Sequence, residues 1–242
     1  MIGFFVILTI ALTLAALYIT GVIKPPLLAK TLASLAFVAL GAYALFVPGG
    51  RVWADLSAST EAAASSEAGL VFTPFRILLF CGLCFGSLGD VLLELFDEKD
   101  KRFFLGVGAF FIGHALYVAS YFQIDAGSAW IALLCAFPIT ALLTILSARL
   151  LTFEGARRVL LLTYMFALSF MCSFAWVILI RRGLAPFRLI APGAILFLLS
   201  DSSLGLQMFG NEKLANHRRL LGAICLITYY LAQNLIASSL AF

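Results

Sequence analysis

Long apolar runs of about 20 residues, separated by short polar stretches, restrict the fold of this chain more than any other feature. Backbone N–H and C=O groups inside a bilayer must be paired within the protein, so only helices or closed barrels can span it. The runs lack the apolar–polar alternation of barrel strands. Composition agrees, since 63% of the 242 residues are hydrophobic, 12% are charged and the mean hydropathy is +1.09. The sequence therefore predicts an all-α, polytopic membrane helix bundle.

Breaks rich in Pro, Gly and charged residues divide these runs into about eight transmembrane helices within a single domain, 1–242. We expect the helices at about 2–23, 27–47, 74–95, 103–123, 128–147, 159–180, 186–207 and 220–241. The longest polar connection covers residues 51–73. The first run has no basic segment before it and no clear cleavage site, which favours a spanning helix over a signal peptide.

The distribution of basic residues predicts the orientation. Connections on one side of the eight predicted spans hold 11 of the 16 Lys and Arg residues, and those on the other side hold 5. The positive-inside rule places the richer side in the cytoplasm and both termini outside. The net charge of +4 is then a topology signal, and no basic tract with interleaved aromatics indicates nucleic-acid binding. Short connections fit a bacterial inner (plasma) membrane, although an endoplasmic reticulum protein would look similar.

Two aspartates inside the predicted spans, Asp90 and Asp201, are the residues that most need an explanation. A carboxylate near the bilayer centre costs at least ~2.5–3.5 kcal/mol on insertion scales and commonly marks a functional site. Each lies five or six residues before the end of its helix, on the predicted cytoplasmic side, so both share one depth. A purely structural Asp, paired with an Arg or a Tyr hydroxyl, is the alternative.

Other polar residues lie at mid-span. His114 and Tyr117 share one face of the fourth span, and Tyr229, Tyr230 and Gln233 lie in the last span. Core packing also explains the tyrosines, but a buried Tyr hydroxyl usually has a partner. His114 is the single His in the predicted spans, so we expect no metal site, which needs three or four ligands.

A weak internal similarity relates the third and fourth spans to the seventh and eighth. Both halves run in the same direction, so the similarity would make a parallel 4+4 repeat. Chance likeness between apolar segments explains it equally well. The aligned pairs are Asp90 with Asp201, His114 with Tyr230, and Tyr117 with Gln233.

Four short motifs occur in order along the chain: GDVLL at 89–93, GHALY at 113–117, LSD at 199–201 and TYYLAQ at 228–233. Together with Lys24-Pro25 after the first span, they resemble the YhhN-type lysoplasmalogenase family. The likeness covers nearly the whole chain.

The resemblance implies a membrane-embedded ether hydrolase without a cofactor. Its substrate would be a lysophospholipid, a lysoplasmalogen whose vinyl ether is cleaved to a fatty aldehyde and a glycerophospho-alcohol. The family's two intramembrane aspartates match Asp90 and Asp201. The residues implied in substrate binding or orientation are His114, Tyr117, Tyr229, Tyr230 and Gln233. Lys24 and Lys30 lie on the same predicted side of the membrane as both aspartates, and from that position they would hold the lipid phosphate, although ordinary topology signals explain them equally well.

Vinyl ether hydrolysis fits a pair of carboxyl groups. Protonation of the β-carbon gives an oxocarbenium ion, water adds, and the hemiacetal collapses to aldehyde and alcohol. A general acid and a nearby negative charge serve the same purpose in glycoside hydrolysis. The residues leave open which Asp donates the proton, the head group and the oligomeric state.

Two other functions use the same aspartates differently. A proton-coupled transporter would also carry paired intramembrane aspartates and a repeat. A membrane scaffold without catalysis would tolerate their replacement. A serine hydrolase is disfavoured, because the sequence has no G-x-S-x-G.

Overall fold

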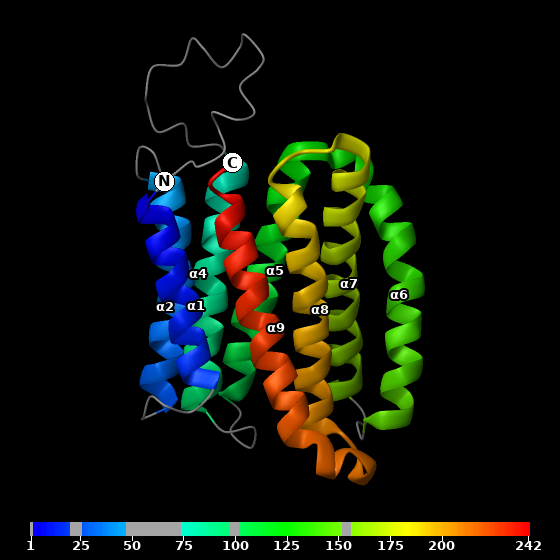
Figure 1. Ribbon diagram of the computed structural model, residues 1–242. Helices are drawn as coiled ribbons and strands as arrows, with labels where there is room; N and C mark the ends of the chain where they lie inside the picture. The colour runs from blue at the N-terminus through cyan, green and yellow to red at the C-terminus, as the bar shows by residue number, and fades with distance from the viewer. Residues whose placement is uncertain (1, 20–25, 47–73, 97–101, 152–155) are drawn as a thin grey trace, which may run out of the picture.

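The structure, a computed structural model, describes residues 2–19, 26–46, 74–96, 102–151 and 156–242. Within them the chain is all-α, as predicted, and its helices stand side by side in one bundle (Figure 1). The helices are α1 (Ile2–Ile19), α2 (Pro26–Phe46), α4 (Pro74–Leu95), α5 (Phe103–Asp125), α6 (Ala129–Leu150), α7 (Ala156–Arg182), α8 (Phe187–Phe209) and α9 (Arg218–Ser239). Two short 3₁₀ helices, η2 (Ala126–Ser128) and η3 (Glu212–His217), join α5 to α6 and α8 to α9.

Six stretches of the described chain are long and apolar enough to cross a membrane. One of them, 103–150, contains both α5 and α6, and α1 contributes a shorter apolar helix, Val6–Ile19. A multi-pass membrane protein is therefore confirmed. The eight-span count and the 4+4 repeat stay predictions, and the polar connection 51–73 lies outside the described residues.

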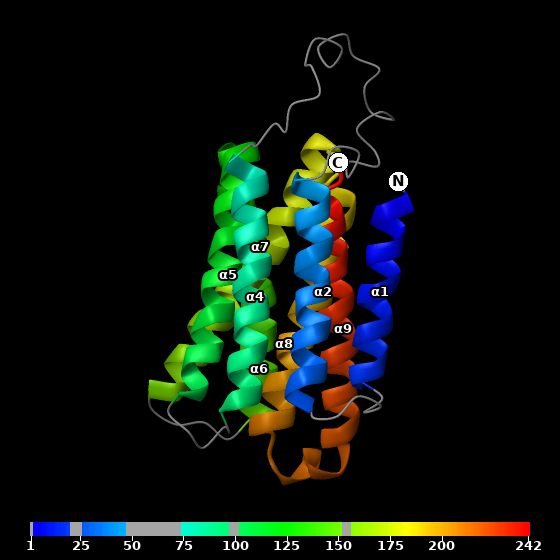
Figure 2. The same ribbon diagram turned by 90° about the vertical axis from the view of Figure 1, so that its left-hand side faces the viewer.

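The helices pack in a definite order. α4 packs along α5, α8 packs along α9, and α2 lies against both α4 and α9 (Figures 1 and 2). α7 contacts α5 and α8, whereas α6 packs on α7 at the edge of the bundle. The start of α1 and the end of α9 lie at the same end of the bundle (Figure 1).

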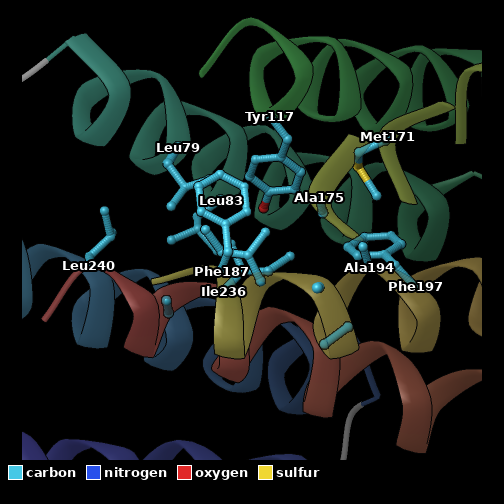
Figure 3. Packing of buried hydrophobic residues seen from close by; sticks show 14 of the residues in the cluster. Leu79, Leu83, Tyr117, Met171, Ala175, Phe187, Ala194, Phe197, Ile236 and Leu240 are labelled. Atoms are coloured by element: carbon cyan, nitrogen blue, oxygen red, sulfur yellow. The ribbon is translucent and has the colours of Figure 1, made fainter. Parts of the chain in front are cut away.

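Glycines on α4 allow its neighbours to come close. A Cβ on Gly82 would overlap the ring of Tyr117 from α5, and a Cβ on Gly86 would overlap the amide of Gln233 from α9. Small residues at helix interfaces permit this approach where lipid supplies no hydrophobic drive. Tyr117 points into the same apolar core as Phe197 of α8 (Figure 3). The close packing brings the polar side chains of α4, α5 and α9 together.

Four polar side chains connect helices at the end of the bundle where α5 leads into α6, and we name them the clamp: Asp125, Ser128, Arg181 and Arg182. The Arg182 side chain donates from Nε to Asp125 Oδ2 at 2.8 Å, and Ser128 Oγ donates to the same oxygen at 2.6 Å. Arg181 donates to Ser128 Oγ at 3.1 Å. The clamp ties the α5–α6 turn to the last turn of α7.

Candidate functional site

Asp90 on α4 lies in a group of two carboxyl groups, one ammonium group and one hydroxyl that we name the Asp90 cluster: Asp90, Lys30, Ser34 and Glu94. Ser34 Oγ donates to Asp90 Oδ2 at 2.5 Å, and Lys30 Nζ lies 3.9 Å from Asp90 Oδ1. Lys30 Nζ is also 3.4 Å from Glu94 Oε2. Lys30 and Ser34 are one turn apart on α2, so both reach α4 from the same helix face. Asp90 is 3% exposed, and both of its oxygens have a partner.

Asp201 on α8 has different neighbours, and we name Asp201, Tyr164 and His114 the Asp201 cluster. The Tyr164 hydroxyl from α7 donates to Asp201 Oδ2. His114 Nε2 from α5 lies 3.1 Å from the Tyr164 hydroxyl and 3.5 Å from the same Asp201 oxygen. Among the described residues, no hydrogen bond or ion pair engages Asp201 Oδ1. One carboxylate oxygen is therefore held, and the other is left for a further partner.

His114 is enclosed within the bundle. It is 2% exposed, and the ring of Phe197 packs edge-to-face against it with centroids 4.6 Å apart. Because the Tyr164 hydroxyl donates to Asp201, it accepts from His114, which places a proton on Nε2. His114 Nδ1 is buried and has no hydrogen-bond partner in the described chain. The geometry thus gives a directed chain of donors from His114 through Tyr164 to Asp201.

Aromatic rings separate the two clusters. The ring centroid of Tyr229 lies 5.5 Å from that of Phe197 and 5.8 Å from that of Phe110. Phe197 contacts the Asp201 cluster through His114, and the Tyr229 hydroxyl donates to the carbonyl of Gly86, one turn before Asp90 on α4. Within the described residues, no hydrogen bond or ion pair joins the two aspartates directly. The structure therefore brings the two predicted residues into one region, on opposite sides of an aromatic layer.

Tyr117, Gln233 and Tyr229 form a buried hydrogen-bond network in the centre of the bundle. Tyr117 donates to Gln233 Oε1 at 2.9 Å, and Gln233 Nε2 donates to the Tyr229 hydroxyl at 3.2 Å. Tyr229 in turn donates to the carbonyl of Gly86 at 3.3 Å. The sequence singled out all three side chains, and their polar groups satisfy one another. Their expected contact with substrate stays a prediction.

The remaining predicted residues have separate places. Tyr230 packs edge-on against Tyr18, with ring centroids 6.0 Å apart, and its buried hydroxyl lacks a partner among the described residues. Lys30 is engaged by Asp90 and Glu94 rather than standing free for a phosphate. Lys24 lies outside the described residues.

A cavity of about 240 Å³ opens beside the Asp201 cluster, at the end of the bundle where α5 and α7 begin and α6 and α8 end. Asp201 and Tyr164 form its polar corner, and Ser147 and Ser202 add two hydroxyls. Leu, Phe, Met, Val and Gly residues make up the rest of its lining. Asp90 is not in the lining. The side chain of Asp201 is 11% exposed, against 5% for that of Asp90.

Two residues of these clusters, Tyr164 and Ser34, were missed by the sequence analysis. Neither lies in a motif, and each acts on a carboxylate from a different helix. Tyr164 lies near one end of its predicted span, where tyrosines are common, so no signal in the sequence set it apart. Glu94 could have extended to water from its helix end, but instead it faces Lys30. Among the described residues, no three His, Cys, Asp or Glu side chains gather as metal ligands do.

The model of the YhhN family matches residues 52–240. The chain belongs to the YhhN family. This family includes lysoplasmalogenases and consists of membrane proteins. No curated protein and no solved structure matches the chain. Both aspartates, His114 and Tyr164 lie inside the region matched by the YhhN model, whereas Lys30 and Ser34 precede it.

Proposed function

We propose that the chain is a membrane-embedded lysoplasmalogenase that hydrolyses the vinyl ether bond of a single-chain lysophospholipid. The products are a fatty aldehyde and a glycerophospho-alcohol. One observation carries the proposal: in a chain of the YhhN family, Asp201 and Tyr164 form the polar corner of a mostly apolar cavity. A vinyl ether lies where an apolar chain meets a polar glycerol, so its surroundings match this corner.

Asp201 takes the part of general acid and then of base. Its carboxyl transfers a proton to the β-carbon of the vinyl ether, which leaves an oxocarbenium ion at the α-carbon and a carboxylate on Asp201. Water then adds to the α-carbon and returns a proton to Asp201. The hemiacetal breaks its bond to the glycerol oxygen, which takes up the hemiacetal proton. One water is consumed and the acid is regenerated, as in other two-stage acid–base mechanisms.

Tyr164 and His114 position this acid. Both contacts to Asp201 fall on Oδ2, so the proton to be transferred is carried by Oδ1. The Tyr164 hydroxyl fixes the rotation of the carboxyl group, and His114 fixes the Tyr164 hydroxyl. Such fixed orientation is a main source of rate in general acid catalysis, because a misplaced donor loses its approach to the reacting atom.

Asp90 supplies fixed negative charge behind the aromatic layer. Lys30 is shared between Asp90 and Glu94, so one cation faces two carboxyl groups, and Ser34 holds the Asp90 carboxylate in one orientation. An oxocarbenium ion formed at Asp201 would be stabilised by this buried charge, since the side chains between them are aromatic rings, which screen charge weakly. Asp90 is therefore required for the reaction without touching the substrate in the cavity.

The orientation of the helices in the membrane is part of the same proposal. We propose that all eight helices cross the bilayer and that both termini face outward. The Asp201 cavity then opens at the cytoplasmic end of the bundle, in a bacterial inner (plasma) membrane. The distribution of basic residues supports this orientation.

The test is aldehyde release by the purified protein from vinyl-ether lysophospholipids with choline and ethanolamine head groups. A saturated alkyl-ether analogue, which has no vinyl ether to protonate, is the substrate control. Asp90→Asn and Asp201→Asn should abolish release, whereas Asp125→Asn, the same change in the distant clamp, should retain it. Monodisperse wild-type protein that releases no aldehyde from either lipid would contradict the hydrolase and favour the transporter.

A further inference from the structure

The geometry points to a hydrocarbon-chain subsite: we propose that the cavity beside Asp201 holds the alkenyl chain of the lipid, and that Gly205 determines how much chain it admits. The inference rests on the proposed function, because it assigns the part of the substrate that the cavity binds. It also names a specificity-determining residue.

The lining supports an apolar chain rather than a head group. Five helices provide apolar side chains, among them Leu93 of α4, Phe104 of α5, Leu146 of α6, Leu161 of α7 and Met208 of α8. The lining contains no Lys, Arg or His among the described residues, so nothing there pairs with a phosphate. Burying each CH₂ group of a chain contributes about 0.8 kcal/mol. The cavity is thus suited to bind by chain contact and to ignore the head group.

The polar corner fixes where such a chain begins. The reactive carbons of a vinyl ether are the first two carbons of the chain itself. A chain in the cavity therefore has its first carbons beside Asp201, which transfers the proton, and Tyr164, which positions Asp201. The fatty aldehyde keeps the whole chain, so the product competes for the same subsite.

Gly205 is a lining residue at which neither close helix packing nor a turn requires a glycine. A Cβ on Gly205 would meet no atom within 4 Å, although the residue lines the cavity. By contrast, a Cβ on Gly106 of α5 would lie 2.8 Å from Leu93. The missing side chain at 205 therefore keeps cavity volume open rather than allowing two helices to touch. A larger residue there would project into the chain subsite without displacing the protein.

The variants for the test are Gly205→Ala and Gly205→Leu, with Gly108→Leu as the matched control. A Cβ on Gly108 also meets nothing within 4 Å, but Gly108 is not in the cavity lining. Replacing Gly within a helix favours folding, so none of these variants is expected to unfold. Each is checked by its thermal unfolding midpoint in detergent.

The first measurement is kcat/KM for vinyl-ether lysophospholipids of increasing chain length. Gly205→Leu should lower kcat/KM for the longest chain about 10-fold, the effect of losing roughly two buried CH₂ contacts, and leave the shortest chain nearly unchanged. Gly205→Ala should fall in between, and Gly108→Leu should match wild type. An unaltered chain-length profile in Gly205→Leu would overturn the subsite.

The second measurement does not need turnover. The saturated alkyl-ether lysophospholipid, carrying a photoreactive diazirine near its chain end, is bound to the wild type and cross-linked. Labelled peptides should come from the cavity ends of α5 to α8, and Gly205→Leu should weaken binding about 10-fold. If this holds while no aldehyde is ever released, the subsite stands and the hydrolase fails. Labelling spread evenly over lipid-facing helices would show an ordinary lipid contact and overturn the subsite.

Discussion

The two aspartates differ in what surrounds them more than in where the chain places them. Asp90 has an ammonium group and a hydroxyl, one for each oxygen, and is closed off from the cavity. Asp201 has a hydroxyl and an imidazole on a single oxygen, and it borders the cavity. A carboxylate with a fixed counter-ion is suited to hold a charge, whereas one with a free oxygen is suited to exchange a proton. The same residue type thus supports two roles.

The neighbouring helices create this difference. α2 presents Lys30 and Ser34 to Asp90, and α5 and α7 present His114 and Tyr164 to Asp201. A repeat of four helices would make the two aspartates equivalent, yet they share only a hydroxyl donor, and their second partners are an ammonium group and an imidazole. Tyr117 and Gln233, which the same alignment pairs, are hydrogen-bonded to each other. The 4+4 repeat itself stays a prediction.

The largest effect is expected from Asp201→Asn. An amide has no acidic proton to transfer, so aldehyde release should fall by about 10²–10⁴-fold, the usual contribution of a general acid. The amide has nearly the same shape and still accepts the Tyr164 hydrogen bond, so the unfolding midpoint should stay close to that of wild type. Single-turnover aldehyde assays check the loss of activity, and thermal unfolding checks that the midpoint is unchanged. Residual activity within a few-fold of wild type would remove Asp201 from the reaction.

Asp90→Asn should behave differently, because it damages both activity and stability. Removing one partner of a buried ion pair leaves an uncompensated charge and costs about 3–5 kcal/mol. Glu94 still faces Lys30, so we expect the lower end of that range. Lys30→Met should be the more destabilising change, because it leaves both Asp90 and Glu94 without their counter-ion. If Lys30→Met is no less stable than Asp90→Asn, the pairing of charge in this cluster is not what stabilises Asp90.

The sequence was sufficient to predict individual helices and their buried polar residues, but not which helices pack against each other. Hydropathy and Pro–Gly breaks predicted α4 as 74–95, the bounds that the structure has, and buried polarity identified Asp90, Asp201 and His114. The partners Tyr164 and Ser34 could not be predicted, since their importance depends on which helix faces which. A Tyr or a small Ser in an apolar run is ordinary until the packing brings a carboxylate beside it.

Tyr164→Phe tests whether the Tyr164 hydroxyl positions the Asp201 carboxyl group for proton transfer, a role that has no counterpart in the Asp90 cluster. The variant keeps the ring, which packs against Phe111 and His114, and removes the hydroxyl. We expect kcat to fall about 10–100-fold, with KM nearly unchanged and the pH dependence of kcat shifted, since one charge-assisted hydrogen bond contributes about 1.5–3 kcal/mol. Tyr121→Phe is the control, because its buried hydroxyl has no partner among the described residues. Equal losses in both variants, or an unshifted pH profile in Tyr164→Phe, would reduce Tyr164 to a packing residue.

The smallest effect should come from the clamp, which carries charge and polarity like the two clusters but lies at the other end of the bundle. Arg182→Gln removes the ion pair with Asp125. The Arg182 side chain is 54% exposed, and such exposed pairs are screened by water and contribute little. The unfolding midpoint should therefore drop slightly, more at low salt than at high salt, and aldehyde release should not change. A large loss of activity would mean that the α5–α6 turn is coupled to Asp201 along α7, and that the difference between the two aspartates does not depend on their immediate neighbours alone.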